Sequence, residues 1–486
     1  MKAMPDIRDV DFGRLDAESD KKLPSYFVDT GVIERISRGE RQFVIGRKGS
    51  GKTALFQHPL KSIGGSHIVQ LEFSDYAWES HKAVKELGLP LENAYTASWI
   101  FTFLISACRK WSTSVDQAVS KKAKSVYLKI YGAEEGDLKD ILFDRFRRLR
   151  KIEGPAVGDF IKAGSVEIRD IPDGAHLAHA ANAWNRKLFE LADELFKTKP
   201  ITIFVDRLDD GWDASPEIKA MLSGAIKAAR TINLRYAAKR PPAVVLFLRS
   251  DIYSQLDFND KNKIGADIEH VNWDQGTLID IAGARIAESV PVRKEDAWSA
   301  VFSDKQMRQR AYIPNYIIKR TMLRPRDMIA FCIYCREAAV SNGHSIVEPS
   351  DVYEAEKAYS RHIYEELRDE MHKQVPEYED LFRALNRIGY SRFTFADWEK
   401  SIKDVGLDSG KCKQYLLTLF EYAVVGVPRV GGKGGGSKYE FIYENRFLEP
   451  NFVDDLVVHH ALRKHLNLKD AMPAADGVAE LDLDED

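Results

Sequence analysis

Residues 44–55 read VIGRKGSGKTAL, and the eight residues from Gly46 to Thr53 fit the pattern G-x-x-x-x-G-K-[ST]. An apolar run, residues 43–45, lies directly before Gly46. The pattern predicts a strand, a glycine loop and the start of a helix. Gly46, Gly49 and Gly51 are expected to adopt positive φ and to let successive backbone N–H groups approach a phosphate without an obstructing Cβ.

The side chains of this loop have distinct expected roles. Lys52 supplies a mobile charge for the outer phosphates, and Thr53 places a hydroxyl where it can ligate Mg²⁺. The helix that begins there points its positive dipole end at the nucleotide. This reading is favoured over a plain surface glycine loop. We predict that ATP is held by Gly46, Arg47, Lys48, Gly49, Ser50, Gly51, Lys52, Thr53 and Ala54.

Further apolar runs predict the sheet around this loop. Residues 67–73 alternate like a strand, and residues 201–206, ITIFVD, end in Asp206. The carboxylate of Asp206 is predicted to hold Mg²⁺ directly or through water. Residues 243–248 predict a strand beside it that leads to Arg249, whose side chain can then sense the γ-phosphate.

The acid that activates the attacking water is harder to assign. Many P-loop ATPases carry this acid directly after the strand-ending aspartate, but here that residue is Arg207, and the acids follow at Asp209 and Asp210. We predict that Asp209 activates the water, with Asp210 as the alternative. Either carboxylate could instead cap the helix expected near Ser215.

Length and composition limit the class of protein. A chain of 486 residues is expected to form about three domains. With 71 basic and 74 acidic residues the formal net charge is -3, so nucleic-acid binding would have to be local. No membrane span or signal peptide is predicted. Four cysteines in so long a chain favour a reducing cytoplasm over a disulfide framework. The spacing of Cys332 and Cys335 suits a metal, but no second ligand pair accompanies them, so we expect both in a helix core.

The chain is predicted to divide around the loop. A P-loop domain is expected over residues 1–272, with a helical insertion at about 97–195. The basic segment 145–151 follows several aspartates, which favours a solvated helix face over a nucleic-acid surface. A helical lid is expected over residues 273–372, a winged helix over 373–468 and an acidic tail over 469–486.

The winged helix is indicated by three short helices followed by a hairpin with a glycine-rich tip. Contact with DNA phosphates is one interpretation of its cations, but they are few beside the acids of its second helix, so a packing or partner surface is weighed above DNA binding. The cations in question are Lys411, Lys413, Arg429, Lys433 and Lys438.

Between residue 26 and about residue 340 the chain resembles the AAA+-like and STAND-like P-loop ATPases of bacteria, relatives of the origin-recognition type found in anti-phage defence or signalling loci. The phrases that carry the likeness are GRKGSGKT, IFVDRLDD, VVLFLRSDIY, VNWDQGTLIDIAGARI and RPRDMIAF. The resemblance implies an α/β fold of the ASCE/AAA+-like P-loop NTPase class that hydrolyses ATP with Mg²⁺. It also implies that Arg249 is a first sensor and that Arg324 or Arg326 swings over the phosphates. In relatives the adenine lies near the segment that matches residues 26–28 here.

The sequence departs from this family pattern at the arginine finger, which relatives place between the sensor strand and the last strand. Residues 251–271 contain no arginine, and Lys261 and Lys263 are their only cations. A homo-oligomer is therefore possible but a ring is not assumed. The leading expectation is an ATP-hydrolysing switch that signals to a partner or effector, plausibly in anti-phage defence. The alternatives are a DNA-acting ATPase of initiator type and a protein that binds nucleotide only for structure.

Overall fold

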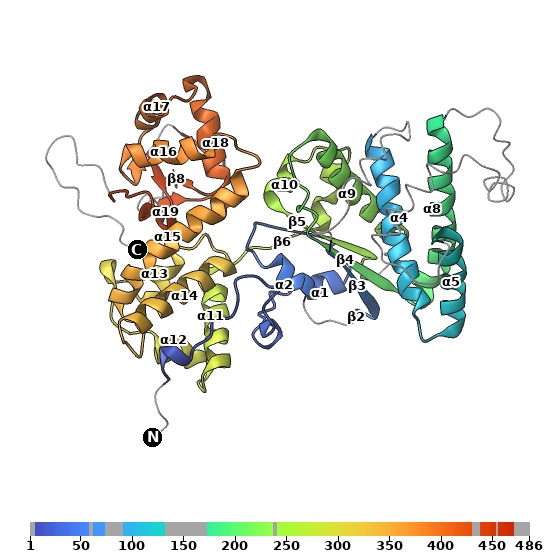
Figure 1. Ribbon diagram of the computed structural model, residues 1–486, viewed down its shortest axis with the longest axis horizontal. Helices are drawn as coiled ribbons and strands as arrows, with labels where there is room; N and C mark the ends of the chain where they lie inside the picture. Colours follow the sequence, from blue (N-terminus) through green and yellow to red (C-terminus); the bar gives the residue numbers. More distant parts are fainter. Residues whose placement is uncertain are drawn as a thin grey trace. The chain divides into compact units, whose positions relative to one another are not determined.

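The computed structural model describes residues 5–57, 62–72, 91–131, 173–236, 241–429, 438–452 and 455–470. The chain forms two compact units (Figure 1). Unit 1 contains Met1–Val28, Lys48–Gly51 and Asn272–Asp486, and unit 2 contains Asp29–Arg47 and Lys52–Val271. The predicted boundaries of the P-loop domain, lid, winged helix and tail stay a prediction. None of the described helices is long and apolar enough to cross a membrane.

Unit 2 is built on a six-stranded sheet in the order β2-β3-β4-β5-β1-β6. Its strands are β1 (Phe43–Gly46), β2 (Ser62–Ile63), β3 (Ser66–Glu72), β4 (Ile201–Asp206), β5 (Val244–Arg249) and β6 (Ile268–His270). Every neighbouring pair is parallel except β2 with β3. Strands β1 and β4 are buried along their whole length, as the continuous apolar runs of parallel strands require. The α/β P-loop NTPase fold predicted from the sequence is confirmed.

The strand order brings the carboxyl ends of three strands to one edge of the sheet. Strand β5 lies between β1 and β4, and its last residue, Arg249, pairs in register with Gly46. Asp206 ends the next strand along. Ligands of open α/β sheets bind outside the carboxyl ends of the strands, so this edge is where a nucleotide site is expected.

Helices cover this sheet and form the insertion. Those next to the strands are α1 (Val32–Ser37), α2 (Lys52–Gln57), α9 (Pro216–Tyr236) and α10 (Ser250–Gln255). The insertion contains α4 (Leu91–Ser112), α5 (Gln117–Tyr131) and α8 (Asp173–Thr198), which lie side by side in Figure 1. The described part of the insertion is thus helical, as predicted. The basic segment 145–151 lies outside the described residues.

The lid helices of unit 1 share a core with the N-terminal segment. They are α11 (Gln275–Ser289), α12 (Ala297–Val301), α13 (Ile313–Ile318), α14 (Pro325–Ser341) and α15 (Pro349–Met371). Ile7, Val10 and Phe12 are buried in the same apolar cluster as these helices. Cys332 and Cys335 are free and fully buried on α14, so the prediction that they belong to the core is confirmed.

The C-terminal part of unit 1 is a winged helix. Its helices are α16 (Tyr378–Ile388), α17 (Phe395–Asp404), α18 (Cys412–Glu421) and α19 (His460–Arg463). Its sheet has the order β7-β10-β8-β9, formed by β7 (Arg392–Phe393), β8 (Val425–Arg429), β9 (Lys438–Glu440) and β10 (Leu456–Val458). Strand β10 was not predicted, and it joins β7 to β8 by antiparallel pairing. Lys433 and the tail from residue 471 lie outside the described residues.

Candidate nucleotide-binding site

The glycine loop connects the end of β1 to the start of α2, as predicted. Gly49 and Gly51 have φ values of 77° and 89°, in the left-handed region that a side chain disfavours. Gly46 is not among the described residues with positive φ, because it still belongs to the extended strand β1. The expectation of positive φ was therefore wrong for Gly46 and right for the other two glycines.

Lys52 folds back over the start of the loop. Its Nζ donates to the carbonyl oxygens of Gly46 at 2.9 Å and Arg47 at 3.0 Å. Burial lowers the pKa of the Lys52 amine, and the carboxylates of Asp209 and Asp206 oppose this shift. The amine is therefore held at the loop by two backbone carbonyls, and the two carboxylates favour its charged form.

Thr53 and Asp206, the two predicted magnesium ligands, lie together. Thr53 Oγ1 donates to Asp206 Oδ2 at 2.9 Å. Burial raises the pKa of Asp206 to about 6, while Lys52 acts to lower it. A hydroxyl and a carboxylate are hard oxygen ligands of the kind Mg²⁺ prefers, with its remaining positions filled by phosphate and water. The described residues contain no group of three or more His, Cys, Asp or Glu side chains suited to a metal, so they offer no all-protein cage.

The turn after β4 separates the two candidate acids. Arg207 has φ of 62°, an uncommon conformation for a residue with a side chain. Its Nε donates to Asp210 Oδ2 at 3.1 Å, so Asp210 faces Arg207. Asp209 Oδ2 instead accepts from Arg249 Nη1 at 3.4 Å. In the first turn of α9, the N–H of Ile218 donates a hydrogen bond to the Ser215 Oγ.

Arg249 lies at the end of β5 between two carboxylates. Its Nε and Nη2 donate to Asp251 at 3.1 and 2.6 Å, and its Nη1 reaches Asp209. The sequence analysis missed Asp251, although it stands two residues after the predicted sensor. The arrangement holds a cation beside the group predicted to activate water. The catalytic roles of Lys52, Asp209, Asp210, Arg249 and Arg326 stay predictions.

The two arginines of RPRD both lie beside the loop residues that belong to unit 1. Arg324 is 2% exposed, and its guanidinium donates to Asp327, to Glu370 and, at 3.4 Å, to the carbonyl of Lys48. Arg326 is 24% exposed at its side chain and pairs with Glu366 at 3.0 Å. A Cβ added to Gly49 would lie 3.2 Å from the Cβ of Arg326.

Glu366 on α15 also forms an ion pair with Lys48, whose Nζ lies 3.5 Å from the carboxylate. The sequence analysis did not predict a role for Glu366. Desolvation by burial raises the pKa of Glu366, but Arg326 and Lys48 outweigh it, so its pKa is lowered overall. Arg324 is thus fixed inside the lid, whereas Arg326 has a partly exposed side chain on the loop. Of the two candidate lid sensors, Arg326 has the more accessible guanidinium.

The two lysines that stand in the place of an arginine finger have different surroundings. Lys261 Nζ donates to the carbonyl oxygens of Tyr253 and Leu256 at the end of α10. Lys263 pairs with Asp260 at 2.8 Å, and its side chain is 62% exposed. Lys261 therefore satisfies carbonyl groups at the C-terminal end of α10. Of the two lysines, Lys263 has the side chain that is exposed to solvent.

Tyr26, near which relatives are expected to hold the adenine, is buried in unit 1. Its hydroxyl donates to Asp20, and the guanidinium of Arg285 lies 4.2 Å from its ring centroid. Phe27 and Val28 are half-buried. The segment is thus fastened to the lid through Tyr26.

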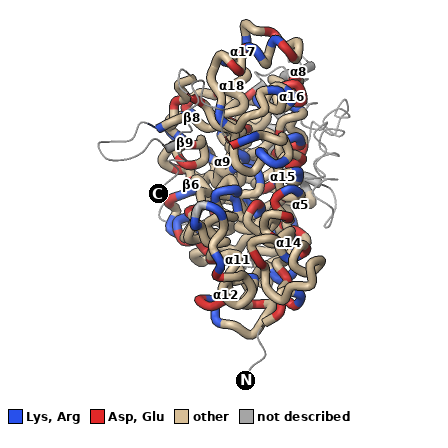
Figure 2. Tube along the Cα trace, turned by 90° about the vertical axis from the view of Figure 1, so that its left-hand side faces the viewer, with Lys and Arg blue, Asp and Glu red and all other residues tan. Residues whose placement is uncertain are grey.

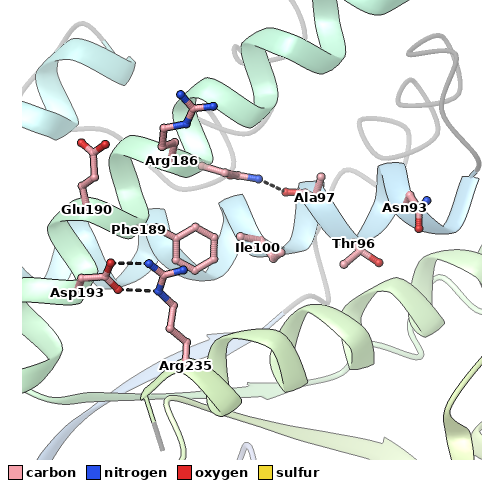
Figure 3. Close-up of a pocket in the computed structure, with 10 residues that line it drawn as sticks. Asn93, Thr96, Ala97, Ile100, Arg186, Phe189, Glu190, Asp193 and Arg235 are labelled. Carbon is pink, nitrogen blue, oxygen red and sulfur yellow. Dashed lines mark hydrogen bonds and ion pairs between the residues drawn. The ribbon is translucent and has the colours of Figure 1, made fainter. Parts of the chain in front are cut away.

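A separate cavity of about 430 Å³ lies in the insertion among α4, α8 and the end of α9 (Figure 3). The Arg235 guanidinium lies 4.7 Å from the Phe189 ring and is bonded to Asp193. Asn185 Nδ2 donates to the Ala97 carbonyl at 2.9 Å. None of the predicted site residues lines this cavity, and its contacts join α8 to α9 and α4. We assign it no part in nucleotide binding.

A family model described as the FunZ-associated C-terminal helical domain matches residues 276–368, which cover most of the lid helices α11 to α15. In Escherichia coli strain K12 the putative transposon gamma-delta 80.3 kDa protein is 22% identical over 403 residues. That match covers 78% of this chain and 54% of the relative, so the chain spans about half the length of this curated relative.

Solved structures give more distant similarities. Cdc6p from Pyrobaculum aerophilum is 13% identical with a TM-score of 0.28, over 90% of this chain and 92% of that one. The ORC2 protein of Aeropyrum pernix in ADPNP-ADP complexes is 11% identical with a TM-score of 0.30, over 85% and 91% of the two chains. Drosophila ORC bound to DNA is 11% identical with a TM-score of 0.26, over 90% and 83%. The class assigned here, an α/β P-loop NTPase, rests on the sheet and the loop described above.

Proposed function

We propose that this protein is an ATP-dependent molecular switch. In this proposal, ATP with Mg²⁺ binds at residues 46–54, hydrolysis resets the site, and the lid passes the nucleotide state to a partner or effector protein. The observation that carries it is the contact of Thr53 with Asp206 at 2.9 Å, because it places a hydroxyl and a carboxylate together at the start of the loop helix. A plain glycine loop would not require this pairing with the end of β4.

The residues at the sheet edge suit this chemistry. Lys52 would exchange the carbonyls of Gly46 and Arg47 for the β- and γ-phosphates. Asp206 in its ionised form would, with Thr53, hold Mg²⁺, which when bound neutralises charge on the phosphates. Asp209 would then orient and deprotonate a water for attack on the γ-phosphate. Arg249, already beside Asp209, would sense whether that phosphate is present.

The lid would read the nucleotide through Arg326. Its pairing with Glu366 and its packing on Gly49 link α14, α15 and the loop within unit 1. A bound γ-phosphate would compete with Glu366 for this guanidinium, since both are anions that a planar fork can bind with two hydrogen bonds. Exchange of that partner is the step by which ATP would change the lid.

Hydrolysis and lid response test this proposal together. ATP turnover and the protease sensitivity of the chain are measured with ATP, ADP and no nucleotide, for the wild type and for Arg326→Ala. The matched control is Arg361→Ala, which removes an exposed α15 ion pair with Glu365. We expect ATP-specific protection in the wild type and the control but not in Arg326→Ala. Identical digestion in all nucleotide states would exclude a switch.

A DNA-acting ATPase is the second candidate, and the winged helix favours it. Lys411 and Lys413 are exposed at the start of α18, the third helix of that fold. Figure 2 nevertheless shows acidic as well as basic residues on α17, so the local field is mixed. Duplex DNA should raise ATP turnover if this reading is correct, and Lys411→Ala with Lys413→Ala should remove the effect. The paired control is Lys400→Ala with Lys403→Ala on α17.

The biological setting belongs to the proposal as well. The resemblance of the sequence motifs supports a bacterial anti-phage or signalling role, and the name of the Escherichia coli relative connects that relative with a transposon. Loss of phage resistance in cells that carry Lys52→Ala would support the first, and unchanged resistance would remove it.

A further inference from the structure

Trp273 contacts the phosphate loop from the short linker between β6 and α11. Its indole Nε1 donates to the Ser50 carbonyl at 2.8 Å. A Cβ added to Gly51 would lie 3.5 Å from the Trp273 ring, so the indole also packs against the next residue of the loop. Trp273, Ser50 and Gly51 all belong to unit 1. The motif reading of the sequence assigned Trp273 no role.

The contact fixes the direction of one peptide group in the loop. The peptide bond between Ser50 and Gly51 is planar, and in its trans form the C=O of one residue and the N–H of the next point in opposite directions. Tying the Ser50 carbonyl to Trp273 therefore turns the Gly51 N–H away from the indole. Backbone N–H groups presented in this way by a turn are the groups that bind anions.

The position of Trp273 in the chain places it directly before a lid helix. Asp274, the next residue, is the N-cap of α11, and its Oδ1 accepts from the N–H of Thr277 at 2.9 Å. Trp273 is thus attached directly to the first turn of a lid helix. The indole bonds the backbone carbonyl of Ser50, not its side chain. The Ser50 Oγ is buried and has no hydrogen-bond partner among the described residues.

We propose that Trp273 is a positioning residue of the phosphate loop, and that its indole N–H sets the Gly51 N–H toward the β-phosphate of a bound nucleoside di- or triphosphate. The inference rests on the proposed function, because it assigns a regulator to the same site. A change in the lid that turns the start of α11 would withdraw this donor and weaken phosphate binding. Affinity for ATP and lid position are thereby coupled through one hydrogen bond.

The test compares two tryptophans that make the same kind of bond. Trp273→Phe keeps an aromatic ring against Gly51 but removes the donor. Trp298→Phe is the matched control, since Trp298 Nε1 donates to the Ile279 carbonyl at 3.0 Å inside the lid. We expect Trp273→Phe to bind ATP and ADP about three- to tenfold more weakly, the effect of one lost hydrogen bond, with kcat kept. Trp298→Phe should change binding less than about twofold.

A rescue variant separates positioning from general stability. Trp273→His restores a planar N–H donor in a smaller ring and should recover part of the affinity that Trp273→Phe loses, at equal or lower thermal stability. Nucleotide should also change the tryptophan emission of the wild type and of Trp298→Phe, but not that of Trp273→Phe. Equal ATP affinity in Trp273→Phe and Trp298→Phe, or no recovery in Trp273→His, would overturn the inference.

The wild type and Lys52→Ala serve as the reference for the site itself. If the wild type binds ATP and Lys52→Ala does not, an unchanged Trp273→Phe contradicts only the role of Trp273. If the wild type binds no ATP at all, the proposed function fails first.

Discussion

Arg249 Nη1 lies 3.4 Å from Asp209 Oδ2, and the same guanidinium is bonded to Asp251. Asp210, one residue further on, faces Arg207 instead. Asp209 also contributes to the field at the Lys52 amine. Asp209 thus bonds the residue that ends the sensor strand and acts on the loop lysine, whereas Asp210 bonds Arg207 at the turn after β4.

Asp209→Asn is therefore expected to retain ATP binding and to lose roughly a hundredfold or more in kcat, because it removes a positioned base. Asp210→Asn is the matched variant, since it removes a neighbouring carboxylate that pairs with Arg207. Its kcat should stay within about threefold of the wild type. Steady-state phosphate release measures both, and a larger loss in Asp210→Asn would reverse the assignment.

The raised pKa of Asp206 predicts a specific pH dependence of stability. Its folded pKa of about 6 lies above the ordinary value of 3.8, because burial penalises the charged form. The carboxyl group therefore contributes stability that is fully present below about pH 4 and is lost as the pH rises through about 6. The total is on the order of 3 kcal/mol.

Asp206→Asn should remove this loss, since the amide does not ionise. In urea denaturation without Mg²⁺, the free energy of unfolding of Asp206→Asn minus that of the wild type should increase between pH 4 and pH 7. Asp280→Asn, which alters an exposed residue of α11, should show no such trend. In the wild type Mg²⁺ should bind more tightly as the pH rises through 6. A flat difference curve would contradict the burial of a charged Asp206.

The two RPRD arginines should differ in what they stabilise. Arg324→Ala leaves Asp327 and Glu370 buried without their partner, and we expect a loss of about 3–5 kcal/mol in the free energy of unfolding. Arg326→Ala removes a partly exposed pair and should cost less than about 1 kcal/mol. It should nevertheless slow hydrolysis. Chemical denaturation and ATP turnover, measured on the same samples, distinguish the two variants. If Arg326→Ala were unfolded, Arg326 would have a structural role and not a sensing one.

Most of the fold could be predicted because its signals are local. The run ITIFVD predicts a buried strand that ends in a carboxylate. The loop pattern predicts the strand before the loop and the helix after it. Strand β10 was missed because Leu456–Val458 is three residues long and exists through its pairing with β7 and β8. The N-terminal residues Ile7 and Phe12 show no sequence pattern that would place them in the lid core.

The candidate site was predicted residue by residue but not in its connections. The loop pattern predicted Lys52 and Thr53, and the end of the strand ITIFVD predicted Asp206. Glu366 and the donor Trp273 were missed, because a side chain's contact across more than a hundred residues leaves no periodicity in the sequence. Asp251 lies only two residues from Arg249, but no motif marks it as the partner of that guanidinium. The choice between Asp209 and Asp210 likewise depended on the turn made by Arg207.

Equilibrium binding of ATP to the wild type and to Lys52→Ala tests the central claim most directly. Lys52 Nζ is held by the Gly46 and Arg47 carbonyls at the start of the loop, and no other loop lysine has a buried amine. Titration with a fluorescent ATP analogue and Mg²⁺ should give saturable binding by the wild type and at least about a hundredfold weaker binding by Lys52→Ala. Equal affinity of the two proteins, or no binding by the wild type, would contradict the nucleotide site and the switch built on it.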